Sequence, residues 1–123
     1  MRIRSFIMPF ALLAFGSLFV ACGGGGETED PDGLPACPDG GTDLTYDNFG
    51  KAFFDTHCTS CHADGSGEPG AQNIPFTTQA QIQAEAEDIH ERAGGTNTNM
   101  PPGGGPTADE RQQLTEWLSC GAK

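Results

Sequence analysis

The segment Cys58-Thr59-Ser60-Cys61-His62 constrains the chain most, because it places two thiols and an imidazole within five residues. Cys-x-x-Cys-His is the pattern of covalent haem attachment. Two thiols at this spacing can each add across one vinyl group of the haem, and the imidazole that follows reaches the iron from the same side. The segment therefore predicts a haem site in which Cys58 and Cys61 carry the porphyrin and His62 ligates the iron.

Three other arrangements are compatible with the two cysteines. A thioredoxin-like redox pair would need a βαβ context, and the sequence shows no strand pattern to supply one. A zinc site would need two more ligands, and the candidates His57 and His90 lack a paired spacing. A disulfide between Cys58 and Cys61 is also chemically possible.

The N-terminal residues have the pattern of an export signal. Arg2 and Arg4 precede an apolar run at 6–20 and the pair Ala21-Cys22. The run is shorter than the roughly 20 residues that cross a bilayer. Residues 18–22 resemble the lipobox of bacterial lipoproteins, in which the cysteine becomes the lipidated first residue. We therefore expect a signal peptide at 1–21 and a lipid on Cys22, which would anchor the protein on the periplasmic side of a bacterial membrane or at the cell surface.

The residues after Cys22 are expected to form a flexible tether at 22–36. Four glycines at 23–26 and an acidic stretch at 27–33 predict a flexible chain that repels itself. The folded domain is then expected at 37–123.

Composition shows why this domain needs a cofactor. Loss of the signal would remove Arg2 and Arg4 and change the formal net charge from −11 to −13, and only eleven Leu, Ile, Val or Phe residues would remain. Such an acidic, glycine-rich chain buries too little apolar surface to offset its chain entropy. A haem can supply much of the missing apolar core, as metals and disulfides do in other small domains.

Cys37 and Cys120 stand near the two ends of the domain, outside the haem motif. An exported protein meets an oxidising compartment, where disulfides persist. We therefore expect a disulfide between these two cysteines, and two free thiols are the alternative.

Helical patterns without strand-like alternation predict an all-α domain with long loops. The patterns span about 46–56, 79–93 and 107–120, and glycine- and proline-rich loops at 63–75 and 96–106 separate them. The expected N-caps are Thr45, Thr77 or Thr78, and Thr107, the last as part of a capping box.

The second axial ligand decides the chemistry of a haem iron. A methionine thioether raises the reduction potential and suits electron transfer, whereas an empty site admits oxygen or peroxide. Met100 is the only methionine that would remain after signal cleavage, and Pro101 and Pro102 stiffen its loop. We therefore expect Met100 to be the distal ligand, with His57 and His90 as the alternatives.

The order of these features resembles the class I mono-haem cytochromes c across about residues 44–120. The shared features are an aromatic helix, Cys58-x-x-Cys61-His62, a glycine-rich loop, an amphipathic helix, Met100-Pro101-Pro102, and a terminal helix with Leu114, Trp117 and Leu118. The resemblance implies a small all-α fold of three or more helices around one covalently attached haem c. It also implies that the first and last helices cross edge to face.

The resemblance further implies a proline carbonyl that orients the imidazole of His62 through its second ring nitrogen, a role expected physically around a metal. Pro75 is the candidate, and Pro69 is also in range. The residues expected at the helix crossing are Phe49 or Phe53 and Trp117 or Leu118.

Together these features predict a one-electron carrier tethered to a membrane surface and not an enzyme. No small-molecule substrate is evident, and a peroxidase would need a distal acid-base pair that the sequence does not offer. The alternative is a haem-based sensor or small-ligand-binding domain in which Met100 is displaced. The acidic surface favours a redox protein partner with a basic docking surface and argues against nucleic acid.

Overall fold

The computed structural model describes residues 33–71 and 73–123. In these residues the chain forms helices and no strands, which confirms the all-α prediction. The elements in order are η1 (Tyr46–Gly50), α1 (Lys51–His57), α2 (Gln79–Ala84), α3 (Ala86–Ala93) and α4 (Ala108–Ser119). None of these helices has the length and apolar character needed to cross a membrane. The predicted signal peptide at 1–21, the lipidated Cys22 and the tether up to residue 32 lie outside the described residues.

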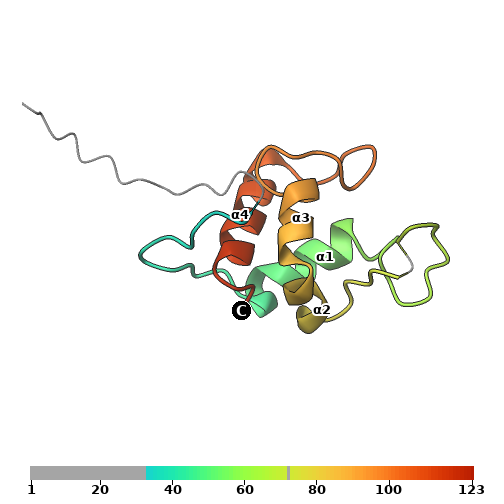
Figure 1. The fold of residues 1–123 in the computed structure, drawn as a ribbon, viewed down its shortest axis with the longest axis horizontal. Coiled ribbons are helices and arrows are strands. Elements are labelled where there is room, and N and C mark those ends of the chain that lie inside the picture. The colour runs from blue at the N-terminus through green and yellow to red at the C-terminus, as the bar shows by residue number, and fades with distance from the viewer. Residues whose placement is uncertain (1–32, 72) are drawn as a thin grey trace, which may run out of the picture.

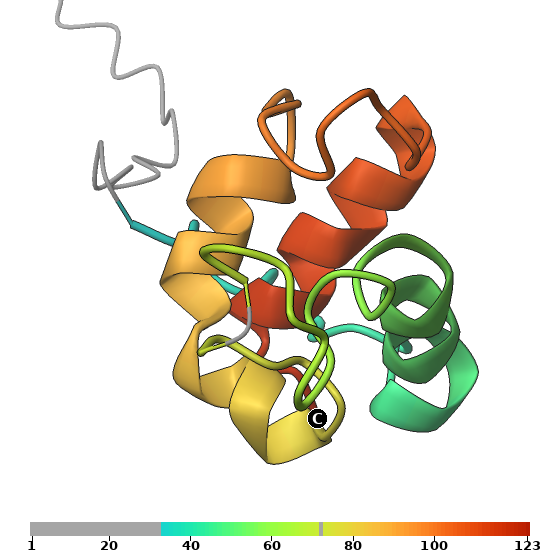
Figure 2. The same cartoon turned by 90° about the vertical axis from the view of Figure 1, so that its right-hand side faces the viewer.

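The helices α3 and α4 lie side by side, and η1 and α1 run across them (Figures 1 and 2). The loop between α3 and α4 closes one end of this pair. At the other end the chain returns to the start of η1, where the N–H of Tyr46 donates to the carbonyl oxygen of Lys123 at 2.7 Å. The first and last parts of the domain are therefore held together by a direct backbone contact.

Threonine caps fix where three of the helical segments begin. Each cap accepts a hydrogen bond from the backbone N–H three residues ahead, and the side chain at that position accepts one from the cap N–H. The cap and partner pairs are Thr45 with Asn48, Thr78 with Gln81, and Thr107 with Glu110. These contacts confirm the predicted starts and select Thr78 over Thr77.

The predicted single helix at 79–93 is two helices in the structure. Glu85 has φ −113° and ψ 19°, which lies outside the helical range and separates α2 from α3. The side chains of Gln79 and Gln83 in α2 donate to the carbonyl oxygen of Ala122 at 2.8 and 3.1 Å. The break thus lets α2 bind the C-terminal residues while α3 packs along α4.

The core sits where α1, α2, α3 and α4 meet. Its fully buried side chains are Phe54, Ile82, Leu114, Trp117 and Leu118. The rings of Phe49 in η1 and Trp117 in α4 lie 6.0 Å apart at an interplanar angle of 71°, so one of the residue pairs expected where the first and last helices meet is in contact. Gly50 lies buried at this crossing, and a Cβ at this position would come within 2.5 Å of Trp117 Cζ2. The crossing therefore requires a residue without a side chain.

A disulfide joins Cys37, ahead of η1, to Cys120, directly after α4, with the two Cα atoms 4.7 Å apart. The bridge spans 83 positions of the sequence. It ties the segment that enters the domain to the end of the last helix.

Replacing both Cys37 and Cys120 by alanine should lower the free energy of unfolding by roughly 4 kcal/mol, since the unfolded chain regains the entropy of an open loop. Denaturant unfolding of the haem-loaded protein measures this difference. A reductant should destabilise the wild type by a similar amount and leave the variant unchanged. An equal midpoint for the wild type and the variant would contradict the prediction.

The packing of α3 on α4 places His90 against Thr115, whose Oγ1 lies 3.1 Å from His90 Nδ1. Burial lowers the pKa of His90 below its ordinary value of 6.5. The folded protein therefore keeps this imidazole neutral at a pH where the unfolded chain binds a proton.

Stability should accordingly fall as the pH drops below about 6.5 and through the lowered pKa of His90. Denaturation midpoints measured between neutral and mildly acidic pH should show this slope, and His90→Gln should reduce it. If His90→Gln keeps the full wild-type dependence of the denaturation midpoint on pH, groups other than His90 cause that dependence.

Candidate functional site

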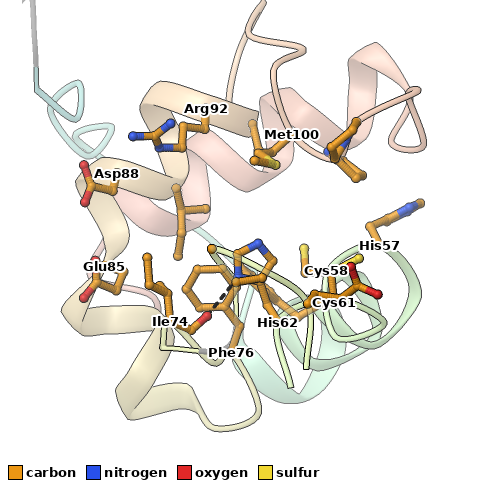
Figure 3. Close-up of a pocket in the computed structure, with 18 of the residues that line it drawn as sticks. His57, Cys58, Cys61, His62, Ile74, Phe76, Glu85, Asp88, Arg92 and Met100 are labelled. Carbon is orange, nitrogen blue, oxygen red and sulfur yellow. Dashed lines mark hydrogen bonds between the residues drawn. The ribbon is translucent and has the colours of Figure 1, made fainter. Parts of the chain in front are cut away.

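A mostly apolar cavity of about 450 Å³ opens between α1, α3 and the loops on either side of them (Figure 3). Its apolar lining includes Phe54, Ala71, Phe76, Ile89, Ala93 and Pro106. Cavities that hold small molecules and cofactors have volumes of about 300–1,000 Å³ and are lined in this way. The cavity is thus large and apolar enough for an extended cofactor.

The two thiols of the motif stand at the edge of this cavity because α1 ends just before them. The N–H groups of Cys61 and His62 both donate to the carbonyl oxygen of Cys58, at 3.1 and 2.8 Å. This turn brings both cysteines and His62 to one side of the cavity. Both cysteines are free thiols in the structure.

Cys58 is the more enclosed of the two cysteines, since it is half-buried and Cys61 is exposed. Burial raises the pKa of the Cys58 thiol to about 12, and the positive charge of Arg111 opposes this shift. At neutral pH the thiol is therefore protonated, so the apolar cavity contains no buried thiolate at this position.

The ring of His62 is fixed by the segment that follows the first loop. Its Nδ1 lies 2.9 Å from the carbonyl oxygen of Ile74, and its ring stacks on Phe76 at 4.7 Å. Because a carbonyl oxygen only accepts, Nδ1 carries the hydrogen and donates it. In the neutral ring the lone pair is then on Nε2, which is the form a metal needs.

The expected acceptor for His62 was the carbonyl of Pro75, and the structure corrects it by one residue to that of Ile74. Pro75 does not line the cavity. A residue before proline is biased toward an extended backbone, and this bias limits the directions open to the Ile74 carbonyl. Pro75 therefore acts on the imidazole through its neighbour.

Met100 lines the same cavity and lies across it from His62 (Figure 3). Its side chain is half-buried and packs against the core. The backbone N–H of Met100 donates to the carbonyl oxygen of Arg92 in α3 at 2.9 Å. The loop therefore presents the thioether to the cavity from the end of α3.

The two alternative histidines differ in position. His90 is absent from the cavity lining and contacts Thr115. His57 lines the cavity on the same side as Cys58, and its Nε2 lies 3.7 Å from a carboxylate oxygen of Glu110. Neither imidazole occupies the position that Met100 takes opposite His62.

Four charged residues in or near the site were not predicted from the sequence. Glu85, Asp88 and Arg92 form a charged edge of the cavity, and their spacing of three and four residues could have shown that they share a face (Figure 3). Arg111 is buried with 3% of its surface exposed, although charged residues are mostly exposed. No sequence signal distinguished it from the surface residues of α4.

The family model of cytochrome c oxidase, cbb3-type, subunit III matches residues 48–118. The match covers more than half of the chain and includes both thiols, the imidazole and the thioether of the cavity. The chain belongs to this family. It is therefore a c-type cytochrome with a small cytochrome c fold, a haem c with its iron as cofactor, and a role in electron transfer with a redox protein partner. Comparisons with curated proteins and with solved structures gave no match.

The side chains of this cytochrome fit a haem c. Two free thiols stand at the cavity edge, an imidazole is held through Nδ1 and leaves its Nε2 unbonded, and a soft thioether lies across the cavity. The aromatic and aliphatic lining matches the apolar faces of a porphyrin. Two thiols, an imidazole and a thioether therefore line one cavity that is apolar and large enough for the cofactor.

Proposed function

We propose that this cytochrome carries single electrons on one haem c, which Cys58 and Cys61 hold covalently and which His62 and Met100 ligate, as in the class I mono-haem cytochromes c. The observation that carries the proposal is the placement of His62 and Met100 across one apolar cavity from each other, with both free thiols at its edge. No other described feature explains why these four side chains gather there.

The two thiols fix the cofactor within the cavity. Each thiol would add across one vinyl group, with the sulfur bonding to one carbon and the hydrogen to the other, so no oxidant would be consumed. Because Cys58 continues directly from α1, the attachment is rigid with respect to the helical core. Two such bonds would prevent dissociation of the haem during repeated oxidation and reduction.

His62 and Met100 would set the chemistry of the iron. Haem c supplies an iron that changes between the +2 and +3 states when one electron enters or leaves. His62 is held in one orientation by Ile74 and Phe76, and Met100 by its backbone contact to α3. Both ligands can therefore stay in place during the change, and little reorganisation is needed. A methionine thioether also favours a high potential.

The proposed location follows from the sequence. A lipid on Cys22 would hold the domain on a membrane surface through the tether at 22–36. The acidic domain would then approach a basic redox partner, and Glu85 and Asp88 at the cavity edge contribute to this charge. Electrostatic attraction of this kind weakens as salt rises.

A pyridine haemochrome assay on protein matured in a bacterial periplasm tests the proposal. We expect covalent haem at one per chain, resistant to acid-acetone extraction, and its loss in the Cys58→Ala/Cys61→Ala double variant. Absence of covalent haem from the wild type would refute the proposal. Ready binding of carbon monoxide by the reduced wild type would instead favour a sensor in which Met100 is displaced.

A further inference from the structure

Arg111 in α4 is the only buried polar or charged side chain among residues 33–71 and 73–123, with 3% of its surface exposed. Within the same residues no carboxylate lies within ion-pair distance of its guanidinium. A buried cation without a counter-ion destabilises a fold unless other polar groups surround it. The groups that Arg111 contacts therefore indicate what this charge does.

Those groups are three backbone carbonyls. Nη1 of Arg111 donates to the oxygens of Ala93 at 2.8 Å, Asn97 at 2.8 Å and Met100 at 2.9 Å. Because Nη1 carries two hydrogens, two of the oxygens share one of them. Ala93 is the last residue of α3, whose final carbonyls lack helical partners. One buried cation thus fastens the end of α3 and the loop with Met100 to α4.

The backbone of Met100 is held from both sides as a result. Its N–H donates to Arg92 in α3, and its carbonyl accepts from Arg111 in α4. The carbonyl of Arg111 in turn accepts from the N–H of Gly95 at 3.1 Å, at the start of the same loop. With both peptide groups fixed, only rotations within the side chain remain for the Met100 sulfur.

We propose that Arg111 is a positioning residue for Met100, which keeps the thioether over the cavity and makes its displacement by an external ligand unfavourable. The proposal rests on the proposed ligation by Met100. Arg111 does not line the cavity and acts through the loop. Hydrogen bonds from a charged donor are about twice as strong as neutral ones. Without the hydrogen bonds from Arg111, the loop that carries Met100 would have more conformational freedom. Binding of the Met100 sulfur to iron would then cost more conformational entropy.

Arg111→Met tests this role, because methionine keeps an unbranched apolar stem and has no donor. The variant should keep covalent haem, lose intensity in the far-red band of methionine-ligated ferric iron, and bind imidazole about tenfold to a hundredfold more tightly than the wild type. In Arg111→Lys the charge is kept, but the ammonium nitrogen ends one bond short of the position of Nη1. Its imidazole affinity should lie between those of the wild type and Arg111→Met.

Two controls separate positioning from general effects. Lys51→Gln removes an exposed positive charge of α1 and should keep the wild-type band and affinity, which excludes an effect of net charge. Gly50→Ala strains the contact between the end of η1 and Trp117, which lies six positions after Arg111 in α4 and makes no contact with the Met100 loop through Gly50. Gly50→Ala should lower the unfolding midpoint without tightening imidazole binding. Loss of stability alone would then not explain the tighter imidazole binding of Arg111→Met.

The outcomes for Arg111 and for Met100 can be told apart. Met100→Ala should lack the far-red band, and an unchanged band in that variant would overturn both the ligation and the role of Arg111. If Met100→Ala loses the band while Arg111→Met keeps it with wild-type imidazole affinity, only the role of Arg111 is overturned. If Arg111→Met yields no haem-loaded protein, Arg111→Lys becomes the test. A wild-type far-red band together with a wild-type imidazole affinity in Arg111→Lys would then overturn the proposal.

Discussion

Replacing Met100 by alanine should lower the reduction potential of the haem-loaded protein and open its iron to external ligands. The thioether favours the reduced iron, so its loss should lower the potential on the order of 0.1 V or more, within the roughly 0.8 V range that axial ligands span. The far-red band of the oxidised protein should disappear, and the reduced protein should bind carbon monoxide. Potentiometric titration and visible spectra measure these changes.

Alanine also removes part of a half-buried side chain, so a second substitution is needed to isolate the sulfur. Met100→Leu keeps nearly the same apolar volume, and such exchanges typically cost less than about 1.5 kcal/mol of stability. We expect the same spectral change and potential shift from Met100→Leu as from Met100→Ala, with a smaller loss of stability. A wild-type spectrum in Met100→Leu would show that the sulfur is not the ligand.

The helical pattern of the sequence predicted most of the fold because local signals were strong. Threonine caps at 45, 78 and 107 mark helix starts that the structure reproduces. The break at Glu85 was missed, since no glycine or proline marks it. It depends on contacts between α2 and the C-terminal residues, which are distant in sequence.

In the site too, short sequence motifs were predictable, whereas contacts between segments distant in sequence were not. The motif at 58–62 and the proline-flanked Met100 were visible in the sequence, and the structure places them at one cavity. The acceptor for His62 was misplaced by one residue, because a carbonyl direction depends on the backbone of a long loop. Arg111 was missed because its burial arises only when the loop after α3 folds over α4.

Gly50 is a position where one methyl group should have a large effect on stability. Its backbone is right-handed helical, with φ −54° and ψ −52°, so any residue could adopt it. In an open helix, alanine would even be favoured over glycine by about 1 kcal/mol. The reason for glycine is therefore space, because an added Cβ would approach Cζ2 of Trp117 to 2.5 Å.

Gly50→Ala should consequently destabilise the protein by about 1–3 kcal/mol, the usual range for overpacking of a core. For a domain of this size, that corresponds to a fall in Tm of at least about 4 °C. Thermal unfolding of the haem-loaded protein measures it. Gly40→Ala is the matched control, since its Cβ would meet no atom within 4 Å.

The double variant Gly50→Ala/Trp117→Phe shows whether the ring is the cause. Trp117 is fully buried and its Nε1 donates to the carbonyl oxygen of Lys123 at 3.1 Å, so Trp117→Phe alone destabilises the fold. A smaller ring leaves room for the added methyl group, so the two substitutions together should cost less than the sum of their separate effects. Strictly additive losses would mean that Gly50 is required for a reason other than its contact with Trp117.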